Sequence, residues 1–301
     1  MKDGIARSPL FYVGDKYKLI KEIRTHFPPA IKRFIEPFVG GGSVFLNVEA
    51  EKYLLNDIDQ NVISIHQMLC SYSYRQNEFF ESLFSLIDSY GLSLSYLRND
   101  IPDDLKKAFP KSYFAKYNKE TYAKMKRDYN TGNIDNKMML YVLLIYGFNR
   151  MLRFNSKGEF NLPVGDVDFN KNTFVALDDY LRLVKEKPIE WYNTDFNTFL
   201  NGIDYCAGDL IYLDPPYLIS SSEYNKLWNE ENERGLLAVL DKLSERGTRW
   251  AISNVTHYKG KVNELFLNWS NKYNSFPIKS NYISFNDNSV KKFNEVLITN
   301  Y

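Results

Sequence analysis

The stretch IYLDPPYLIS, residues 211–220, places one carboxylate, two prolines and a tyrosine directly after an apolar run. Each proline fixes its own φ and lacks an N–H, so the Asp-Pro-Pro-Tyr segment makes a stiff corner. The Asp214 carboxylate and the Pro215 carbonyl are hydrogen-bond acceptors, and Tyr217 offers a ring face. Two acceptors beside a stacking plane suit a planar base that carries an exocyclic amino group. The corner therefore predicts methylation of a nucleobase amine.

An aromatic amine is a poor nucleophile because its lone pair is delocalised into the ring. Hydrogen bonds from its two N–H groups to Asp214 and the Pro215 carbonyl would favour electron density on nitrogen and aim the lone pair at a methyl donor. A paired base must first leave the duplex, and Tyr217 would then replace its lost stacking. The same corner could hold adenine or cytosine, in DNA or in RNA.

A glycine-rich turn, FVGGGS at 38–43, follows a predicted strand at 33–39 and precedes a predicted helix at 44–51. Glycines let a ligand approach the backbone amides closely, which fits a nucleoside-type cofactor. The turn lacks the third glycine of GxGxxG and a following GK[ST], so it fits neither a dinucleotide site nor a P-loop. Asp57 ends the next predicted strand, where a carboxylate can accept hydrogen bonds from both ribose hydroxyls. A tight turn followed by a helix-capping aspartate is the simpler alternative.

Strand-like and helix-like segments alternate on both sides of a long middle region. Strands are expected at 33–39, 53–58, 209–214 and 248–254, a helix at 229–247, and antiparallel strands at YISF, 282–285, and EVLITNY, 295–301. This alternation predicts an α/β fold with a mostly parallel, doubly wound sheet covered on both faces.

The middle region, residues 65–174, is rich in tyrosine, asparagine and lysine. It shows helical periodicity, most clearly at Lys137–Phe148, and ends in a hairpin-like stretch, RFNSKGEFNLP at 153–163. We expect a mainly helical inserted subdomain with a hairpin, flanked by a sheet domain made of 1–64 and 175–301. Insertions on a rigid α/β scaffold often carry specificity.

Charge is unevenly distributed, although the formal net charge is only +1. The stretch 106–127 interleaves eight lysine and arginine residues with five aromatic ones. It could neutralise nucleic-acid phosphates or form a solvated helical face.

The cysteines and histidines do not suggest a metal site. Cys70 and Cys206 lack CxxC spacing and are expected to be core residues, and His26, His66 and His257 follow no metal-binding pattern. No stretch approaches the roughly 18 apolar residues of a membrane span, and no early segment resembles a signal peptide. We therefore expect a cytoplasmic protein with no metal and no membrane partner.

The segments FYVGDK, FVGGGS, NDID, GFNRMLRFNSKGEFNLPVG and DPPY occur in an order that resembles the Dam-type DNA adenine-N6 methyltransferases, the D12 class with α-group motif order, and especially their short phage members. The likeness spans nearly the entire chain. It implies a Rossmann-like fold that uses S-adenosylmethionine, releases S-adenosylhomocysteine and carries a target-recognition insertion. The implied reaction methylates a flipped adenine in duplex DNA, within GATC or a related GAT-containing site.

The resemblance also implies roles for matching residues. The catalytic corner would be Asp214, Pro215 and Tyr217. The cofactor-binding residues would be Tyr12, Lys16, Phe38, Gly40, Gly42, Asp57, Asp195, Phe196 and Asp214, with Asp57 on the ribose and Asp195 and Phe196 at the cofactor's adenine. The DNA contacts would be Phe148, which inserts into the duplex, Asn149 near the orphaned base, Arg153 on a guanine and Pro163 on a nearby base.

Two residues depart from the family pattern: Arg150 stands where glycine is frequent, and Phe11 stands where some bacterial relatives use a lysine to touch the outer guanine. Residue type alone would make Lys16 a solvated lysine and Arg153 an ion pair or phosphate contact. A catalytically silent DNA-binding protein is the rival from another class, and cofactor binding separates the two. The resemblance is compatible with a monomer in solution, a second copy on palindromic DNA and a cognate restriction endonuclease encoded elsewhere.

Overall fold

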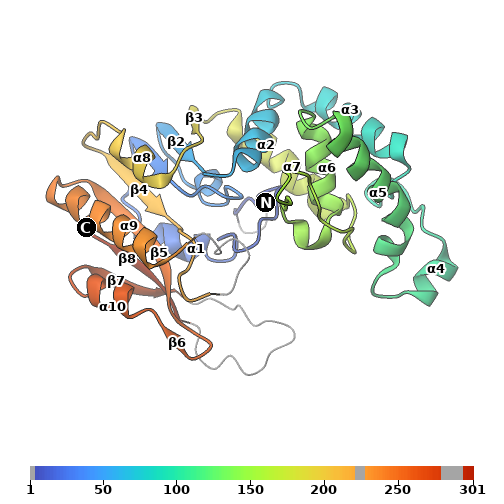
Figure 1. The fold of residues 1–301 in the computed structure, drawn as a ribbon. Coiled ribbons are helices and arrows are strands. Elements are labelled where there is room, and N and C mark those ends of the chain that lie inside the picture. The colour runs from blue at the N-terminus through green and yellow to red at the C-terminus, as the bar shows by residue number, and fades with distance from the viewer. Residues whose placement is uncertain (1–3, 221–227, 279–293) are drawn as a thin grey trace. The chain divides into compact units, whose positions relative to one another are not determined.

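The computed structural model of this chain describes residues 4–220, 228–278 and 294–301. The chain divides into two compact units. The first unit consists of Met1–Asp15, Gly40–Leu46 and Asp59–Glu186, and the second consists of Lys16–Val39, Asn47–Ile58 and Lys187–Tyr301. The helices of the predicted insertion fall in the first unit and the sheet falls in the second (Figure 1).

The second unit is built on a sheet whose described strands run in the order β3-β2-β1-β4-β5-β8-β7, with β6 paired to β5. The strands are β1 (Arg33–Glu36), β2 (Lys52–Asn56), β3 (Ile189–Tyr192), β4 (Asp209–Leu213), β5 (Arg249–Tyr258), β6 (Lys261–Val262), β7 (Asn274–Ile278) and β8 (Asn294–Thr299). Strands β1 to β5 pair in parallel, and β7 and β8 add antiparallel pairs. The predicted mostly parallel α/β sheet is therefore confirmed; β7 was not predicted, and YISF lies outside the described residues.

Strand order reverses direction between β1 and β4. From β1 the chain continues outward through β2 and β3, whereas β4 and β5 lie on the other side of β1. The carboxyl ends of β1 and β4 thus border a switch point, which is where open α/β sheets bind their ligands.

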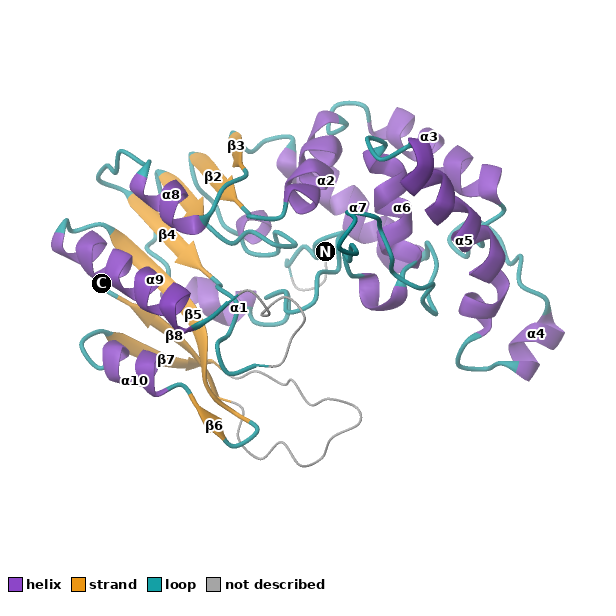
Figure 2. Ribbon diagram, in the orientation of Figure 1, coloured by secondary structure: helices purple, strands orange, loops and turns teal. Residues whose placement is uncertain are grey.

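Apolar side chains alternate between the two faces of the sheet, as the pleat requires. One face carries Ile35, Ile211 and Trp250, which form a core with residues from three helices of this unit. Figure 2 shows these helices beside the strands. Those helices are α8 (Phe196–Asn201), α9 (Glu230–Glu245) and α10 (Glu264–Ser270). The other face carries the rings of Phe34 and Tyr212. Helix α1 (Ile20–Ile23) and the 3-10 turn η1 (Arg24–His26) precede β1.

The prediction of a helix at 44–51 is wrong. Only a 3-10 turn, η2 (Phe45–Asn47), follows the glycines. Strand β2 already begins at Lys52, and Phe45 and Leu46 are buried, so the chain has no room for several helical turns before it rejoins the sheet.

The first unit is mainly helical. Its helices are α2 (Gln60–Ser71), α3 (Gln76–Tyr90), α4 (Asp103–Ala108), α5 (Tyr113–Gly132), α6 (Lys137–Tyr146) and α7 (Lys171–Val184), with the 3-10 turn η3 (Phe148–Arg150) after α6. Residues 139–146 of α6 are buried on every side, because this helix is apolar all around. The predicted hairpin is present as antiparallel bridges between Gly147 and Val164 and between Phe154 and Phe160.

Two smaller expectations have different outcomes. Cys206 is exposed, so the prediction that it lies in the core is wrong; its thiol sits in the surface turn before β4, 3.3 Å from Asp209 Oδ1. Among the helices of the described ranges, none is both long enough and apolar enough to cross a membrane.

His66 braces the glycine turn within the first unit. Its Nε2 lies 2.9 Å from the Gly40 carbonyl, which can only accept, so Nε2 carries the proton. Its Nδ1 then accepts from the Tyr180 hydroxyl at 2.8 Å. Burial lowers the pKa of His66 to about 4. The imidazole is therefore neutral and fixed in one tautomer.

We predict a pH-dependent loss of stability from this residue. The folded-state pKa lies below the unfolded value, so the unfolded chain binds more protons between the two values, and stability falls as pH falls through that window. From about pH 7.5 to about pH 5 the loss through His66 should be about 2 kcal/mol. Urea unfolding of the first unit's helices, followed by circular dichroism, measures it. His66→Gln should lack this component, and an equal pH dependence in both proteins would contradict the assignment.

Candidate active site

Asn56 ties together the carboxyl ends of three parallel strands. Its fully buried side chain donates at 3.0 Å to the carbonyls of Pro37, after β1, and Thr194, after β3, and accepts from the Thr194 amide. Asn193 in turn donates to the carbonyls of Asp57 and Ile58 at 2.8 and 3.1 Å. This edge of the sheet is therefore rigid at the point where the predicted cofactor residues of the second unit begin.

Aromatic rings gather at the same edge. The predicted cofactor residues Phe38 and Phe196 lie 5.5 Å apart, and Trp228 lies 5.8 Å from Phe38 and 5.5 Å from Phe196, measured between ring centroids. Glu233 accepts from the Trp228 indole N–H at 3.1 Å. The cluster offers flat apolar surface suited to a planar ring. Trp228 was not predicted, because its type alone does not separate it from core aromatics.

Two predicted acidic residues lie after β2 and β3. Asp57 is partly exposed beside Ile58, whose side chain is 72% exposed. Asp195 caps α8, its Oδ1 accepting from the amides of Asn197 and Thr198 at 3.0 Å. A hydrogen bond from the Thr198 side chain, together with those from the two amides, lowers the pKa of Asp195. One carboxylate oxygen of Asp195 is thus used structurally.

The glycine turn and Tyr12 lie together in the first unit. A side chain at Gly40 would meet the Tyr12 ring at 3.4 Å, and one at Gly41 would meet Tyr12 Cβ at 2.6 Å. Gly42 has φ +79°, and a Cβ there would overlap the Phe45 ring. These glycines are needed for close packing against Tyr12 and Phe45 as well as for backbone access.

The DPPY corner is joined to a buried lysine. Lys16 Nζ lies 2.8 Å from Asp214 Oδ2 and 2.7 Å from the Tyr217 hydroxyl. The Tyr217 hydroxyl also lies 2.9 Å from Asp214 Oδ1. Glu295 Oε1 completes the group, 3.2 Å from the Tyr217 hydroxyl and 3.4 Å from Lys16 Nζ. We call these four residues the corner cluster.

Burial governs the electrostatics of the corner cluster. The side chain of Lys16 is only 3% exposed, which overturns the expectation from residue type that it would be solvated. Burial alone would lower its pKa, but the adjacent Asp214, Tyr217 and Glu295 outweigh that effect and raise the pKa. Burial raises the pKa of the Tyr217 hydroxyl. Both shifts favour a charged lysine and an un-ionised Tyr217 hydroxyl.

The predicted DNA contacts of the first unit converge at the foot of the hairpin. The Phe148 amide donates to the Pro163 carbonyl at 2.9 Å, and the Phe148 side chain is 52% exposed. The ring of Phe148 is therefore accessible, and its insertion into a base stack stays a prediction.

Backbone strain marks the neighbouring residues. Asn149, Arg150 and Phe11 have φ of 54°, 50° and 49°. Such left-handed conformations cost about 1 kcal/mol or more in residues other than glycine. The two departures from the family pattern are in direct contact: the Arg150 guanidinium lies 3.8 Å from the Phe11 ring centroid, and Arg7 lies 4.5 Å from it. Phe11 is buried among these groups.

Arg153 is held by a residue that sequence reasoning missed. Its Nε and Nη2 donate to the side-chain and backbone oxygens of Asn161, each at 2.9 Å. Asn161 lies across the hairpin, and nothing in its spacing singled it out. The guanidinium keeps its Nη1 hydrogens and one Nη2 hydrogen, so it can still donate two hydrogen bonds from one edge.

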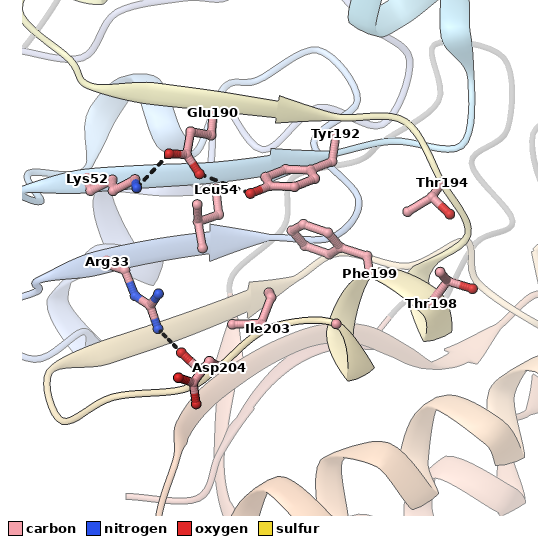
Figure 3. A pocket seen from close by; sticks show the side chains of 11 residues that line it. Arg33, Lys52, Leu54, Glu190, Tyr192, Thr194, Thr198, Phe199, Ile203 and Asp204 are labelled. Carbon is pink, nitrogen blue, oxygen red and sulfur yellow. Dashed lines mark hydrogen bonds and ion pairs between the residues drawn. The ribbon is translucent and has the colours of Figure 1, made fainter.

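A surface pocket of about 330 Å³ opens elsewhere on the second unit, beside β3 and α8 (Figure 3). Three of its charged side chains are already paired: Lys52 Nζ lies 2.6 Å from Glu190 Oε1, and Arg33 Nη2 lies 2.6 Å from Asp209 Oδ2. Arg33 also donates to the Asp204 backbone carbonyl at 2.7 Å. Tyr192 donates to Glu190 Oε2 at 2.9 Å. The predicted site residues do not line this pocket.

Comparison with known proteins decides the family. The model of the D12 class N6 adenine-specific DNA methyltransferases matches residues 12–283. The chain belongs to this family. The matched range includes the glycine turn, the hairpin and the DPPY corner, which are the segments that carried the resemblance.

Three relatives show the range of this family. The modification methylase StsI of Streptococcus sanguinis is 34% identical over 310 residues, which is 98% of this chain and 43% of that protein. The methyltransferase M.FokI of Planomicrobium okeanokoites is 34% identical over 304 residues, with the same coverage. The DNA adenine methylase of Escherichia coli K12 is 26% identical over 256 residues, covering 82% of this chain and 80% of that protein. The chain spans less than half the length of the first two. The closer likeness to short phage members stays a prediction.

Proposed function

We propose that this chain is a site-specific DNA adenine-N6 methyltransferase that transfers a methyl group from S-adenosylmethionine to a flipped adenine in duplex DNA. The observation that carries the proposal is the corner cluster, a DPPY carboxylate held by a buried lysine after β4, in a chain of this family. GATC or a related GAT-containing sequence is the proposed site.

The residues of the second unit fit the cofactor. The rings of Phe38 and Phe196, which pack on each other, offer an apolar surface against which an adenine can stack, and the Asp57 carboxylate can accept from two ribose hydroxyls. By resemblance, Asp195 and Lys16 belong to the same set, as do Tyr12, Gly40 and Gly42 of the first unit. Bound S-adenosylmethionine supplies a methyl group on a positively charged sulfur. The protein must hold the adenine N6 group, orient its lone pair toward that methyl group and exclude water.

The corner cluster can hold the adenine N6 group with its side chains in the positions that the structure shows. Each Asp214 oxygen is already held by one partner, Lys16 or Tyr217, so the carboxylate plane is fixed while spare lone pairs stay available. The adenine N6 group would donate to Asp214 and to the Pro215 carbonyl. Tyr217 is anchored by its hydroxyl, and its ring would stack on the flipped base. Preorganised acceptors of this kind are worth most in a site from which water is excluded.

Recognition is proposed to rest on the first unit. Phe148 would enter the duplex, Asn149 and Pro163 would lie near the bases, and Arg153 would read one guanine through its free edge. Duplex DNA is the proposed partner, and the cytoplasm is the proposed location. A monomer in solution, a second copy on palindromic DNA and a restriction endonuclease encoded elsewhere belong to the same proposal.

Asp214→Ala should lower methyl transfer by at least about 100-fold, because it removes a positioned acceptor for N6. Lys16 keeps Glu295 as a counter-ion, so folding should survive. Cofactor binding should be largely spared, because the other residues of the proposed cofactor set remain. Tritium transfer to a duplex library, read as N6-methyladenine, measures the rate. The exposed Asp204→Ala is the matched control. Undiminished turnover in Asp214→Ala would reject the catalytic corner, and wild-type protein that methylates no adenine would reject the function.

Arg153→Ala should relax discrimination at a single base pair by roughly 1–3 kcal/mol. Asn161→Ala should relax discrimination at the same pair by less, because it only releases the guanidinium. Relative kcat/KM on duplexes with one substituted pair measures both, with the exposed Arg182→Ala as control. An effect spread evenly over all pairs would identify a phosphate contact instead.

The basic stretch can be tested on the side chains that the structure leaves exposed. Several of its lysines are occupied: Lys116 and Lys124 lie over aromatic rings, at 4.8 and 5.5 Å from the ring centroids. Lys107, Lys111 and Lys119 are exposed. Changing these three to glutamine should reduce the salt dependence of DNA binding by about one unit of slope for each phosphate that the protein then leaves unneutralised.

Fluorescence anisotropy over a salt series measures that slope. The control changes Lys52, Lys242 and Lys272, which lie on the second unit. Equal slopes in both triple variants and the wild type would support a solvated helical face.

A further inference from the structure

We propose that Glu295 is the final acceptor of the proton that adenine N6 loses on methylation, and that Tyr217 relays this proton from Asp214. This inference rests on the proposed function and extends it to a residue in the last strand of the chain.

Glu295 is a buried carboxylate in an apolar strand. It lies on β8, opposite Val255 of β5 and Ile278 of β7, and is 2% exposed. Both cross-strand neighbours are apolar. Among the described residues, the side chain of Glu295 therefore makes its polar contacts with the corner cluster. Its Oε2 is buried and has no hydrogen-bond partner within that part of the chain. A buried carboxylate with one oxygen that accepts no hydrogen bond lowers the free energy of unfolding, so we expect Glu295 to have a functional role.

The corner cluster has one more negative charge than positive charges, so it can accept one proton. Lys16 supplies one positive charge against the carboxylates of Asp214 and Glu295, so the ionised cluster carries a net charge of about −1. A proton on Glu295 brings the cluster to neutrality. Burial raises the pKa of Glu295, and the ammonium of Lys16 offsets that effect only in part. The side chain of Asp214 is 20% exposed, whereas that of Glu295 is 1% exposed.

The Tyr217 hydroxyl connects the two carboxylates. It lies 2.9 Å from Asp214 Oδ1 and 3.2 Å from Glu295 Oε1, and its single hydrogen can serve only one of them at a time. Lys16 donates to the same oxygen at 2.7 Å, which orients the hydroxyl hydrogen toward the carboxylates.

The step balances in atoms and charge. A bond forms between N6 and the methyl carbon, while the electron pair of the broken bond stays with the methyl carrier. N6 then releases one proton to the Asp214 carboxylate and keeps the electron pair. Tyr217 takes this proton as it passes its own hydroxyl proton to Glu295 Oε1. Asp214 and Tyr217 return to their starting states, and Glu295 becomes a neutral acid until product leaves.

The test is a single turnover with full-length protein, cofactor and duplex in weak buffer that contains a pH-indicator dye, with methylation quenched in parallel. In the wild type the proton should reach solvent later than methyl transfer, together with product release. In Glu295→Gln, which preserves shape and removes the acceptor, the two events should coincide. Tyr217→Phe, which keeps the ring and removes the relay, should also abolish the lag. Identical lags in wild type and Glu295→Gln, or no lag in the wild type, would overturn the proposal.

A spectroscopic readout separates proton storage from a purely structural role. The infrared difference spectrum of wild-type protein after one turnover should gain a protonated-carboxyl band that Glu295→Gln lacks. Glu190→Gln, a glutamate of the surface pocket, should keep both the band and the lag. A band that persists in Glu295→Gln would exclude Glu295. A wild type that methylates no adenine would instead remove the proposed function, whereas a methylating enzyme without the band would remove only this inference.

Discussion

The structure of the second unit depends on one buried cation, the ammonium of Lys16. Its partners come from distant parts of the chain: Asp214 and Tyr217 follow β4, and Glu295 lies on β8. Taking charges out of water is costly unless each charge is paired and hydrogen bonded. The corner is therefore correctly formed only when the segment before α1, the end of β4 and the last strand are all in place.

The parallel sheet gives that cation its position. Parallel strands bring their carboxyl ends to one edge, and the reversal of strand order between β1 and β4 opens a site there. Asn56 locks the edge by satisfying backbone groups after β1 and β3. Acidic and aromatic residues with separate places in the sequence consequently occupy fixed places along this edge.

In the first unit, the residues proposed to contact DNA are held in place by other groups of the protein. Arg153 is held by Asn161, and Phe148 is presented by a backbone bond to Pro163. Asn149 and Arg150 adopt strained conformations supported by packing of the Arg150 guanidinium on Phe11. Side chains ordered before binding lose less entropy when they meet DNA, which favours specificity.

The α/β class, the strands and helices with strong periodicity, the stiff DPPY corner and the family could be predicted from the sequence, because these depend on local residue types and on motif order. Sequence reasoning misplaced a helix after the glycine turn, since the available length before β2 is a property of the folded chain. It also missed Asn56, Asn161 and Glu295, whose roles come from contacts across the sheet or the hairpin. The burial of Lys16 against two carboxylates could not be predicted, because its burial and pairing are set by residues about 200 and 280 positions away in the chain.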